Sequence, residues 1–525
     1  MKNAFRFAAV LALASFLQPR PATADVRLPR VFGNNMVLQR DIPVPVWGWA
    51  SPGETVQVRV GQTVGRTTAG KDGRWMVRLK AMAAGGPLEM IVRGPNTVRF
   101  TNVLVGDVWV CSGQSNMAWP VSRANRGQEE VAAARHPTIR LLTVPQKQSG
   151  CPEQDAEIQW QACNPQTIGS FSAVAYFFGR ELNRKLNVPI GLINTSWGGT
   201  AIEPWTPREG FALVPSLASF KADIDRAEAS YRELVMQYLA GLEKWLPEAR
   251  TQVKGNGPMP TLPPWPDHPW PEGERKAPAT MYNAMVAPLV PYGIRGAIWY
   301  QGEANVGQGM AYHDKMKALI GGWRKVWGQG DFGFYFVQLA PYGYTARAAT
   351  RPDARRGQFV LPELWEAQLA TLSVPNTGMA VTTDIGNVKD IHPTNKQEVG
   401  RRLSLWALAG TYGQKDIVYS GPLYKSMAIE DGRIRVRFDH VGGGLASRDG
   451  KPLSRFQIAG DDGKFVDAKA EIDGDSVIVS SESVARPKAV RFGWAEDAEP
   501  NLMNREGLPA SPFRTDRGEL NAPAR

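Results

Sequence analysis

Short apolar segments alternate with amphipathic helical segments over residues 104–413, and this alternation constrains the fold more than any other feature of the chain. The predicted strands are rich in β-branched and aromatic residues and lie at 105–111, 189–194, 296–300, 333–339 and 379–383. Predicted helices lie at 174–186, 312–326 and 395–409. Continuous apolar strands are typical of a parallel sheet that is buried on both faces. The repeated strand–helix units therefore predict a doubly wound α/β domain.

The regions on either side of this domain have the pattern of β-proteins. Residues 25–103 contain short alternating strands separated by Gly- and Pro-containing turns, which predicts a small β-sandwich. Residues 414–525 contain further strand patterns, such as 434–438 and 476–480, and predict a β-rich C-terminal domain.

An insertion at about 206–280 interrupts the strand–helix alternation. It contains a predicted helix with an apolar stripe from Ile224 to Trp245, followed by a Pro-rich stretch that carries Trp265 and Trp270. These two tryptophans either line a sugar site or pack against the main domain. Packing is the expectation, because aromatic side chains mostly bury apolar area.

The first 24 residues are typical of a secretory signal peptide. Lys2 and Arg6 precede an apolar stretch that is too short to span a bilayer, and 22–24 (Ala-Thr-Ala) offers the small residues that signal peptidase requires. We expect cleavage after Ala24, a periplasmic or secreted protein, and no membrane span in the mature chain.

Cysteine, histidine and charge patterns exclude several classes of function. With three cysteines, Cys151 and Cys163 either close a small disulfide loop or stay free, and Cys111 is expected to be a buried, inert thiol. Five scattered histidines give no metal-ligand spacing, so no metal and no cofactor are expected. The net charge of +11 is spread without a Lys/Arg run, which argues against a nucleic-acid partner.

The first strand of the α/β region ends in a candidate nucleophile turn. The strand runs into Gly-Gln-Ser-Asn-Met at 113–117. Gly113 permits a tight turn, and Ser115 then lies where ligands bind to open α/β sheets, at the carboxyl ends of the strands. An isolated Gly-x-Ser is more often a simple turn or helix cap, so the motif needs support from the other strand ends.

Three further strand ends supply that support. They carry Ser-Trp-Gly-Gly-Thr at 196–200, Trp-Tyr-Gln-Gly-Glu-Ala-Asn at 299–305 and Asp-Ile-His-Pro at 390–393. Polar residues this dense are costly to bury unless they are hydrogen-bonded or functional. Residues two apart in an extended segment point the same way, so Asp390 can orient the ring of His392.

Together these four motifs resemble the sialate O-acetylesterase family, which belongs to the SGNH hydrolases. That superfamily is named for Ser, Gly, Asn and His on successive blocks, and the same order is found here in Ser115, Gly199, Asn305 and His392. The resemblance extends to Phe-Gly-Trp at 492–494 and to residues 501–509, so it covers nearly the whole mature chain. It implies an SGNH-type, three-layer parallel-sheet domain.

The resemblance also implies a role for each site residue. Ser115 is the expected nucleophile and His392 the general base, with Asp390 or the more distant Asp384 as the acid that orients the imidazole. The expected oxyanion donors are the backbone N–H groups of Ser115 and of Gly199 or Gly198, together with the amide of Asn305. The side chains expected to shape the substrate pocket are Gln114, Trp197, Gln301 and Glu303.

The expected activity is removal of O-acetyl groups from carbohydrate through an acetyl-serine intermediate. The family resemblance implies either acetylated sialic acid or plant-wall glycans such as xylan and xyloglucan as substrate. A non-catalytic glycan-binding protein is the alternative from another class, but such a protein has no use for Ser, Gly, Asn and His at four strand ends. A peptidase or lipase is disfavoured because the motif Gly-x-Ser-x-Gly is absent from the nucleophile turn.

Overall fold

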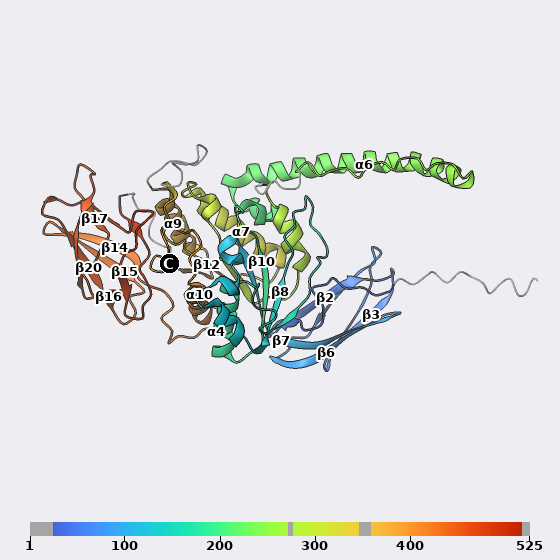
Figure 1. The fold of residues 1–525 in the computed structure, drawn as a ribbon, viewed down its shortest axis with the longest axis horizontal. Coiled ribbons are helices and arrows are strands. Elements are labelled where there is room, and N and C mark those ends of the chain that lie inside the picture. The colour runs from blue at the N-terminus through green and yellow to red at the C-terminus, as the bar shows by residue number, and fades with distance from the viewer. Residues whose placement is uncertain (1–24, 271–276, 346–358, 517–525) are drawn as a thin grey trace, which may run out of the picture.

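The computed structural model describes residues 25–270, 277–345 and 359–516, so the predicted leader at 1–24 lies outside the described residues. The described chain has a mixed α/β architecture. A central sheet with helices packed around it is flanked by β-structure from the N-terminal residues and by separate β-sheets from the C-terminal residues (Figure 1).

The central sheet has the strand order β13-β12-β11-β7-β10-β8-β9. Its strands are β7 (Thr97–Gly113), β8 (His136–Thr143), β9 (Gln161–Cys163), β10 (Ile190–Ser196), β11 (Gly296–Tyr300), β12 (Gly333–Val337) and β13 (Thr377–Ala380). All pairs are parallel except β8 with β9. Each of the five strands predicted from the sequence lies in this sheet, and β8 and β9 add two that the sequence patterns did not indicate. Strands β8, β9 and β10 lie on one side of β7, and the later strands β11, β12 and β13 lie on its other side. The order of strands therefore switches sides next to β7, and sheets of this kind bind ligands at such a point.

Helices pack around this sheet. Their bounds are α2 (Ser115–Ala118), α3 (Gly127–Ala133), α4 (Ala173–Leu186), α5 (Arg208–Phe211), α7 (Ala311–Trp327), α9 (Val360–Ala370) and α10 (Lys396–Gly410). Gly400 of α10 lies directly on Phe177 of α4, and Gly210 of α5 lies on Gly322 of α7, so small residues allow close helix pairs. The three predicted helices match α4, α7 and α10 within two residues, whereas α9 was not predicted.

The N-terminal β-structure shares a strand with the central sheet. Strands β1 (Val37–Gln39), β3 (Thr55–Val60), β4 (Thr63–Thr68) and β6 (Gly85–Arg93) form a sheet with the first part of β7, and β2 (Val44–Trp49) pairs with β5 (Arg74–Leu79) in a second sheet. Strand β7 has 17 residues and continues from the first sheet into the central one. The predicted boundary between residues 103 and 104 therefore lies inside a single strand.

A buried carboxylate fixes β7 at this crossing point. The side chain of Asp107 is fully buried and accepts hydrogen bonds from Gln39 (3.0 Å), Arg40 (3.0 Å to each oxygen), Arg295 (2.9 Å) and Tyr412 (3.0 Å). These partners come from the N-terminal sheet, the loop before β11 and the end of α10. One side chain therefore joins three parts of the fold.

The C-terminal residues form their own β-structure with its own apolar core. The strands are β14 (Leu423–Glu430), β15 (Arg433–Asp439), β16 (Leu445–Ser447), β17 (Phe456–Ala459), β18 (Val466–Asp467), β19 (Lys469–Asp473), β20 (Ser476–Ser480), β21 (Ala489–Phe492), β22 (Leu502–Asn504) and β23 (Phe513–Arg514). They form two four-stranded sheets and one two-stranded sheet. A buried ion pair between Arg514 and Glu366 of α9, with a closest approach of 2.6 Å, ties this structure to the central unit.

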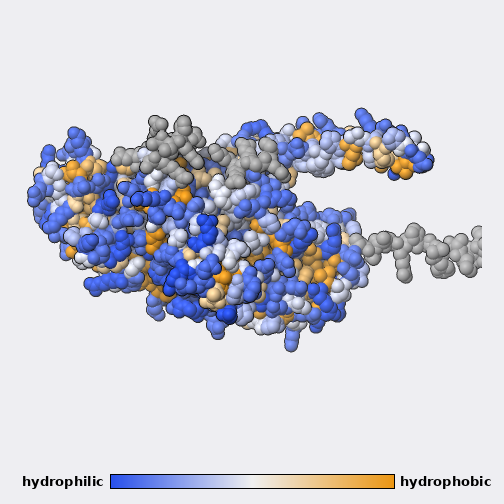
Figure 2. Space-filling view, viewed as in Figure 1, coloured by the Kyte–Doolittle hydropathy of each residue, from blue (hydrophilic) through white to orange (hydrophobic). Residues whose placement is uncertain are grey.

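The insertion forms a long arm. Helix α6 (Ala218–Lys254) and the segment 255–270 that folds back along it are together called the arm below. Trp245 donates a hydrogen bond of 3.0 Å to the carbonyl of Pro260, and the rings of Tyr238 and Trp265 lie 4.9 Å apart, which joins its two layers. Figure 1 shows α6 extending well beyond the central unit. Figure 2 shows apolar side chains scattered among hydrophilic ones along it, and Met236 and Val253 are among those exposed.

The three cysteines are free, so the predicted alternative of a Cys151–Cys163 disulfide is wrong. Cys151 is exposed on the loop after β8, while Cys163 is buried at the end of β9. Cys111 is buried, as expected, and burial raises the pKa of its thiol. Within the described residues, no helix combines the length and the apolar character that crossing a bilayer requires.

Candidate active site

The carboxyl ends of three neighbouring strands bring the predicted motifs together. In the register of the sheet, Gly113 of β7 pairs with Ser196 of β10 on one side and with Tyr300 of β11 on the other. The motifs at 113–117, 196–200 and 299–305 therefore begin at the same level of the sheet. They surround the point where the strand order reverses, next to β7.

Gly113 shapes the turn that presents Ser115. Its φ is +140°, and a Cβ at this position would lie 2.1 Å from the carbonyl oxygen of Tyr300. The next residue, Gln114, donates its backbone N–H to the same carbonyl at 3.0 Å. Only glycine allows the chain to pass this close to β11, and Ser115 then begins the short helix α2.

We expect Gly113→Ala to destabilise the protein and to disrupt the nucleophile turn. The unfavourable φ alone costs about 1–3 kcal/mol, and the collision with Tyr300 adds to that cost. Thermal denaturation and acetate release measure the two effects. Gly330→Ala is the matched control, because Gly330 has a φ of +72° but nothing within 4 Å of the added Cβ. Equal stability losses in the two variants would contradict the argument from close packing.

The structure brings Ser115 and His392 into contact. The Nε2 atom of His392 lies 2.8 Å from the Oγ atom of Ser115, although the two residues are 277 positions apart in the chain. The loop that carries His392 precedes α10, so it reaches the carboxyl edge of the sheet beside α2. This distance is that of a nucleophile paired with its general base.

Of the two candidate acids, Asp390 lies beside His392. Its Oδ1 atom accepts the backbone N–H of His392 at 2.9 Å and lies 3.9 Å from the ring atom Nδ1, and its side chain is 55% exposed. Asp384 instead forms two hydrogen bonds with the guanidinium of Arg402, at 2.6 and 2.7 Å. The geometry therefore favours Asp390 over Asp384 as the acid next to the histidine.

An aromatic side chain holds the histidine ring by its face. The indole of Trp119 stacks on His392 with the ring centroids 5.1 Å apart and an angle of 20° between the planes. Trp119 is itself fixed, because its indole N–H donates to the carbonyl of Arg123 at 2.9 Å and the Arg123 guanidinium lies 4.0 Å from the indole centroid. Stacking thus limits rotation of the imidazole that faces Ser115.

A buried polar cluster lies behind Ser115. The amide of Asn116 donates to Glu303 and to the carbonyl of Ile391 (2.9 Å), and its oxygen accepts from the ammonium of Lys396. Burial lowers the pKa of Lys396 to about 7 and raises the pKa of Glu303. Asn116 thereby connects the nucleophile turn with the loop of His392 and with the motif after β11.

Two glycines follow β10, and one of them, Gly198, lies next to Ser115. A Cβ on Gly198 would lie 3.3 Å from the Cβ of Ser115, while Gly199 has a φ of +74°. The backbone N–H of Trp197 donates to the carbonyl of Gly113 at 3.0 Å and fixes this loop beside the serine turn. Gly198 is the glycine that contacts Ser115.

The contacts of Asn305 do not support its expected role as an oxyanion donor. Its buried amide donates to Glu203 (3.1 Å) and to Gln308 (3.1 Å), and its oxygen accepts from Gln301 (2.7 Å) and from the backbone N–H of Ile202 (3.0 Å). Both hydrogens of the amide are therefore engaged inside the protein. The motif predicted that Asn305 lies near the site, but its position after the strand did not show which way the amide points.

The four residues expected to shape the pocket have different environments. Gln114 and Gln301 are fully buried and hydrogen-bonded to each other at 3.1 Å, so they brace the loops from within. Glu303 contacts Asn116, as described above. Trp197 and Glu303 are both half-buried, in contrast to the two glutamines.

Sequence reasoning missed Trp119, Asn116 and Lys396. Asn116 follows the nucleophile directly and Lys396 lies four residues after His392, so proximity in sequence was the available signal. Their contacts, however, depend on how distant loops meet. Within the described residues no cluster of three or more His, Cys, Asp or Glu side chains has the arrangement of a metal site.

Comparison with known proteins identifies the family. A family model described as carbohydrate esterase, sialic acid-specific acetylesterase, matches residues 105–242 and 268–407. Mouse sialate O-acetylesterase is 30% identical over 463 residues, which are 80% of this chain and 80% of that protein. The human sialate O-acetylesterase is 31% identical over 442 residues, covering 78% of this chain and 76% of that protein.

A solved structure agrees with the same assignment. The crystal structure of a carbohydrate acetylesterase from Xanthomonas citri superposes with a TM-score of 0.78 at 37% identity, covering 94% of this chain and 100% of that one. The chain therefore belongs to the sialic acid-specific acetylesterase family of carbohydrate esterases, and its enzyme class is carbohydrate O-acetylesterase.

Proposed function

We propose that this protein is an exported serine esterase that hydrolyses O-acetyl groups on carbohydrates through an acetyl-serine intermediate. The single observation that carries the proposal is the 2.8 Å contact between the Nε2 atom of His392 and the Oγ atom of Ser115. The two residues are 277 positions apart in the sequence, yet they meet at the edge of the sheet where ligands bind.

In the proposed first step, Ser115 Oγ attacks the acetyl carbonyl while His392 Nε2 takes the hydroxyl proton. The tetrahedral intermediate then collapses, the bond from the acetyl carbon to the sugar oxygen breaks, and His392 returns the proton to that oxygen. In the second step His392 takes a proton from water, the resulting hydroxide attacks the acetyl-serine, and acetate leaves as Ser115 is reprotonated. Asp390 and Trp119 keep the imidazole in place.

Backbone N–H groups are the proposed oxyanion donors. The candidates are Ser115 and the Gly198–Gly199 turn, and the contact of Gly198 with Ser115 supports the placement of that turn. We assign Asn305 a supporting role instead, because its amide is engaged by Glu203 and Gln308. Losing one oxyanion donor typically costs ~10²–10³ in turnover.

Two substrate classes follow from the proposal. The mammalian relatives are named sialate O-acetylesterases, and the Xanthomonas relative is described as a carbohydrate acetylesterase. We propose acetylated sugars as the substrate class, with O-acetylated sialic acid as the first candidate and acetylated xylan or xyloglucan as the second.

The test is acetate release by the purified mature protein, measured side by side on O-acetylated sialoglycan, acetylated xylan and acetylated xyloglucan. We expect release from at least one of the three and labelling of Ser115 by a fluorophosphonate. A folded protein that releases no acetate and takes no label would contradict the proposal and favour a glycan-binding function.

The domain division and export are part of the same proposal. We propose an SGNH-type catalytic domain over 104–413, an N-terminal β-domain over 25–103 and a C-terminal β-domain over 414–525. Two features support the SGNH type. One is the order of the strands in the central sheet, and the other is the position of Ser115 directly after β7, the first strand of that sheet along the chain. Sequencing the N-terminus of the exported protein should show Asp25 as the first residue.

A further inference from the structure

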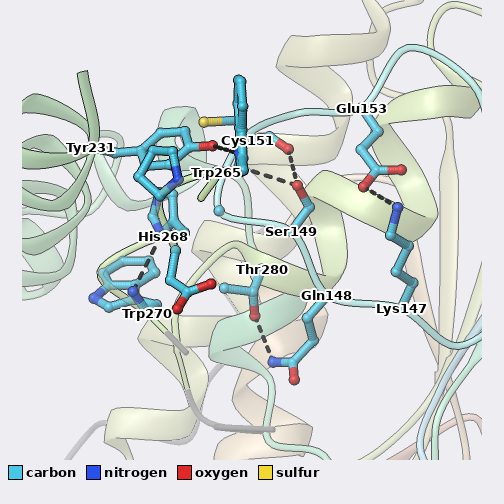
Figure 3. A pocket seen from close by; sticks show the side chains of 13 residues that line it. Lys147, Gln148, Ser149, Cys151, Glu153, Tyr231, Trp265, His268, Trp270 and Thr280 are labelled. Carbon is cyan, nitrogen blue, oxygen red and sulfur yellow. Dashed lines mark hydrogen bonds and ion pairs between the residues drawn. The ribbon is translucent and has the colours of Figure 1, made fainter. Parts of the chain in front are cut away.

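A cavity of about 530 Å³ opens between the arm and the loop that follows β8. One wall is formed by residues 147–151 and 153, with Thr280 at one end, and the other by Tyr231 of α6 and by Trp265, His268 and Trp270 (Figure 3). The volume lies in the range of ~300–1,000 Å³ that is typical of small-molecule sites. No residue of the proposed catalytic machinery lines it.

The aromatic wall holds an exposed ring in a fixed position. Trp265 is 60% exposed, yet its indole N–H donates to the hydroxyl of Tyr231 at 3.1 Å and its edge packs on Tyr238. The ring of His268 lies 4.7 Å from that of Tyr231, and it also contacts Trp270. Trp265 therefore presents a large, immobilised aromatic face beside the other rings that line the cavity, and such a face suits stacking on a ligand.

The cavity also offers a hydrogen-bond donor without a partner. The Nδ1 atom of His268 accepts the backbone N–H of Trp270 at 3.3 Å, and burial lowers the pKa of His268, so the neutral ring carries its hydrogen on Nε2. That Nε2 atom is buried and has no hydrogen-bond partner in the structure. Buried donors are normally satisfied, so a ligand oxygen at this wall would supply the missing acceptor.

The charges of the cavity favour an uncharged ligand. The charged residues that line it are Lys147, Glu153 and Asp267, and Lys147 forms an ion pair with Glu153 at 2.7 Å. The one cation of the lining is therefore already neutralised, and a ligand carboxylate would face Asp267 instead. Neutral hydroxyl groups fit the remaining polar groups, which include the side chains of Gln148 and Thr280.

The cavity lies on the same side of the central sheet as the catalytic residues. Gln146, just before the first wall, donates to the carbonyl of Ser196 at the end of β10 (3.4 Å). At the end of the first wall that holds Thr280, the backbone N–H of the preceding residue, Ala279, donates to the backbone carbonyl of Glu203 (3.1 Å), and the Glu203 carboxylate contacts Asn305. The first wall is thus tied at both of its ends to segments that follow β10, the strand beside the turn of Ser115.

From this arrangement we propose that the cavity is a subsite for a neutral sugar unit of the glycan whose acetyl group is removed. Trp265 stacks on the C–H face of the sugar ring, and His268 and the polar wall bind its hydroxyl groups. This inference rests on the proposed function, since it assigns a second contact for the same substrate. It differs from the sequence expectation that the tryptophans of the arm serve only for packing.

The test compares Trp265→Ala with the wild type on long and short substrates. Trp265 lies on the arm and is not part of the core of the central unit, so the variant should keep that unit folded. We expect its KM for acetylated xylotetraose or O-acetylated sialyllactose to rise roughly 3- to 10-fold, the range of one aromatic contact. Its kcat/KM for 4-nitrophenyl acetate, which has no sugar, should not change. His268→Ala should raise the same KM. The control is Leu262→Ala, because Leu262 is an exposed residue of the arm that does not line the cavity, and this variant should keep the wild-type KM.

Binding is then measured without turnover. Calorimetric titration of the Ser115→Ala protein with each oligosaccharide should give a Kd that weakens by a similar factor when Trp265→Ala is added. Unchanged KM and Kd in an enzyme that is active on the oligosaccharide would overturn the subsite alone. A wild-type protein with no activity on any ester would instead overturn the proposed function, so the two failures are distinguishable.

Discussion

Ser115→Ala is expected to lower acetate release by on the order of 10⁴- to 10⁶-fold while the protein stays folded. The hydroxyl of Ser115 is the proposed nucleophile and lies 2.8 Å from the imidazole of His392, so the substitution removes the reacting group and deletes only one oxygen atom. We expect the free energy of unfolding to change by less than about 0.5 kcal/mol. Acetate assays and chemical denaturation measure the two quantities.

Ser122→Ala is the matched control for this experiment, because Ser122 lies seven residues further along the chain, in the 3-10 helix Val121–Arg123, and has no assigned role. It should keep wild-type activity and fluorophosphonate labelling, whereas Ser115→Ala should lose both. If the purified Ser115→Ala protein kept acetate release within tenfold of the wild type, Ser115 would not be the nucleophile.

The second large effect concerns stability. Asp107→Ala should lower the free energy of unfolding by about 3–5 kcal/mol, the usual cost of breaking a buried charge pair by removing one partner. Arg40 and Arg295 would lose their shared carboxylate, and Gln39 and Tyr412 would each lose a hydrogen-bond acceptor. Urea denaturation measures the loss. Glu482→Ala, at an exposed position, should change stability by less than about 0.5 kcal/mol, and a similar small change for Asp107→Ala would contradict this account.

The same carboxylate predicts a pH dependence. Burial alone would raise the pKa of Asp107. Its pKa is nevertheless lowered from the usual 3.8, because hydrogen bonds and charges from Arg40, Arg295 and Gln39 favour the ionised form. A lowered pKa in the folded state means that the stabilisation is fully present above the unfolded-state pKa and is lost as the pH falls through the folded-state pKa. The stability difference between the wild type and Asp107→Asn should therefore be largest near neutral pH and shrink below pH 3.8. A difference that grows on acidification would contradict the assignment.

Much of the central unit could be predicted from sequence because buried strands and helices leave strong local patterns. The stretch 296–300 was predicted with the bounds that β11 has, since five apolar residues in a row fit a strand buried on both faces. Strand β8 was missed because its sequence begins with His136 and Pro137 and includes Arg140, which hides the apolar pattern of Ile139, Leu141 and Leu142.

The site was predicted at the level of motifs but not of contacts. Ser115 and His392 meet as the order of motifs implied, because parallel strands place their carboxyl ends together. The direction of the Asn305 amide and the burial of Lys396 depend on residues more than a hundred positions away, such as Glu203 and Asn116. No local pattern carries that information. The free state of Cys151 and Cys163 likewise follows from the fold, which exposes Cys151 on a loop and buries Cys163 at the end of β9.

The continuous strand β7 makes the N-terminal β-structure part of the catalytic framework rather than an exchangeable module. It pairs with β6 and β1 in its first part, and it ends at Gly113, two residues before Ser115. No flexible linker intervenes that could be cut, lengthened or grafted onto another enzyme. Chimeras that replace residues 25–103 should therefore succeed only if the foreign segment preserves the strand register up to Leu104, since a slip of one residue would turn the side chains of β7 to the opposite faces of the sheet.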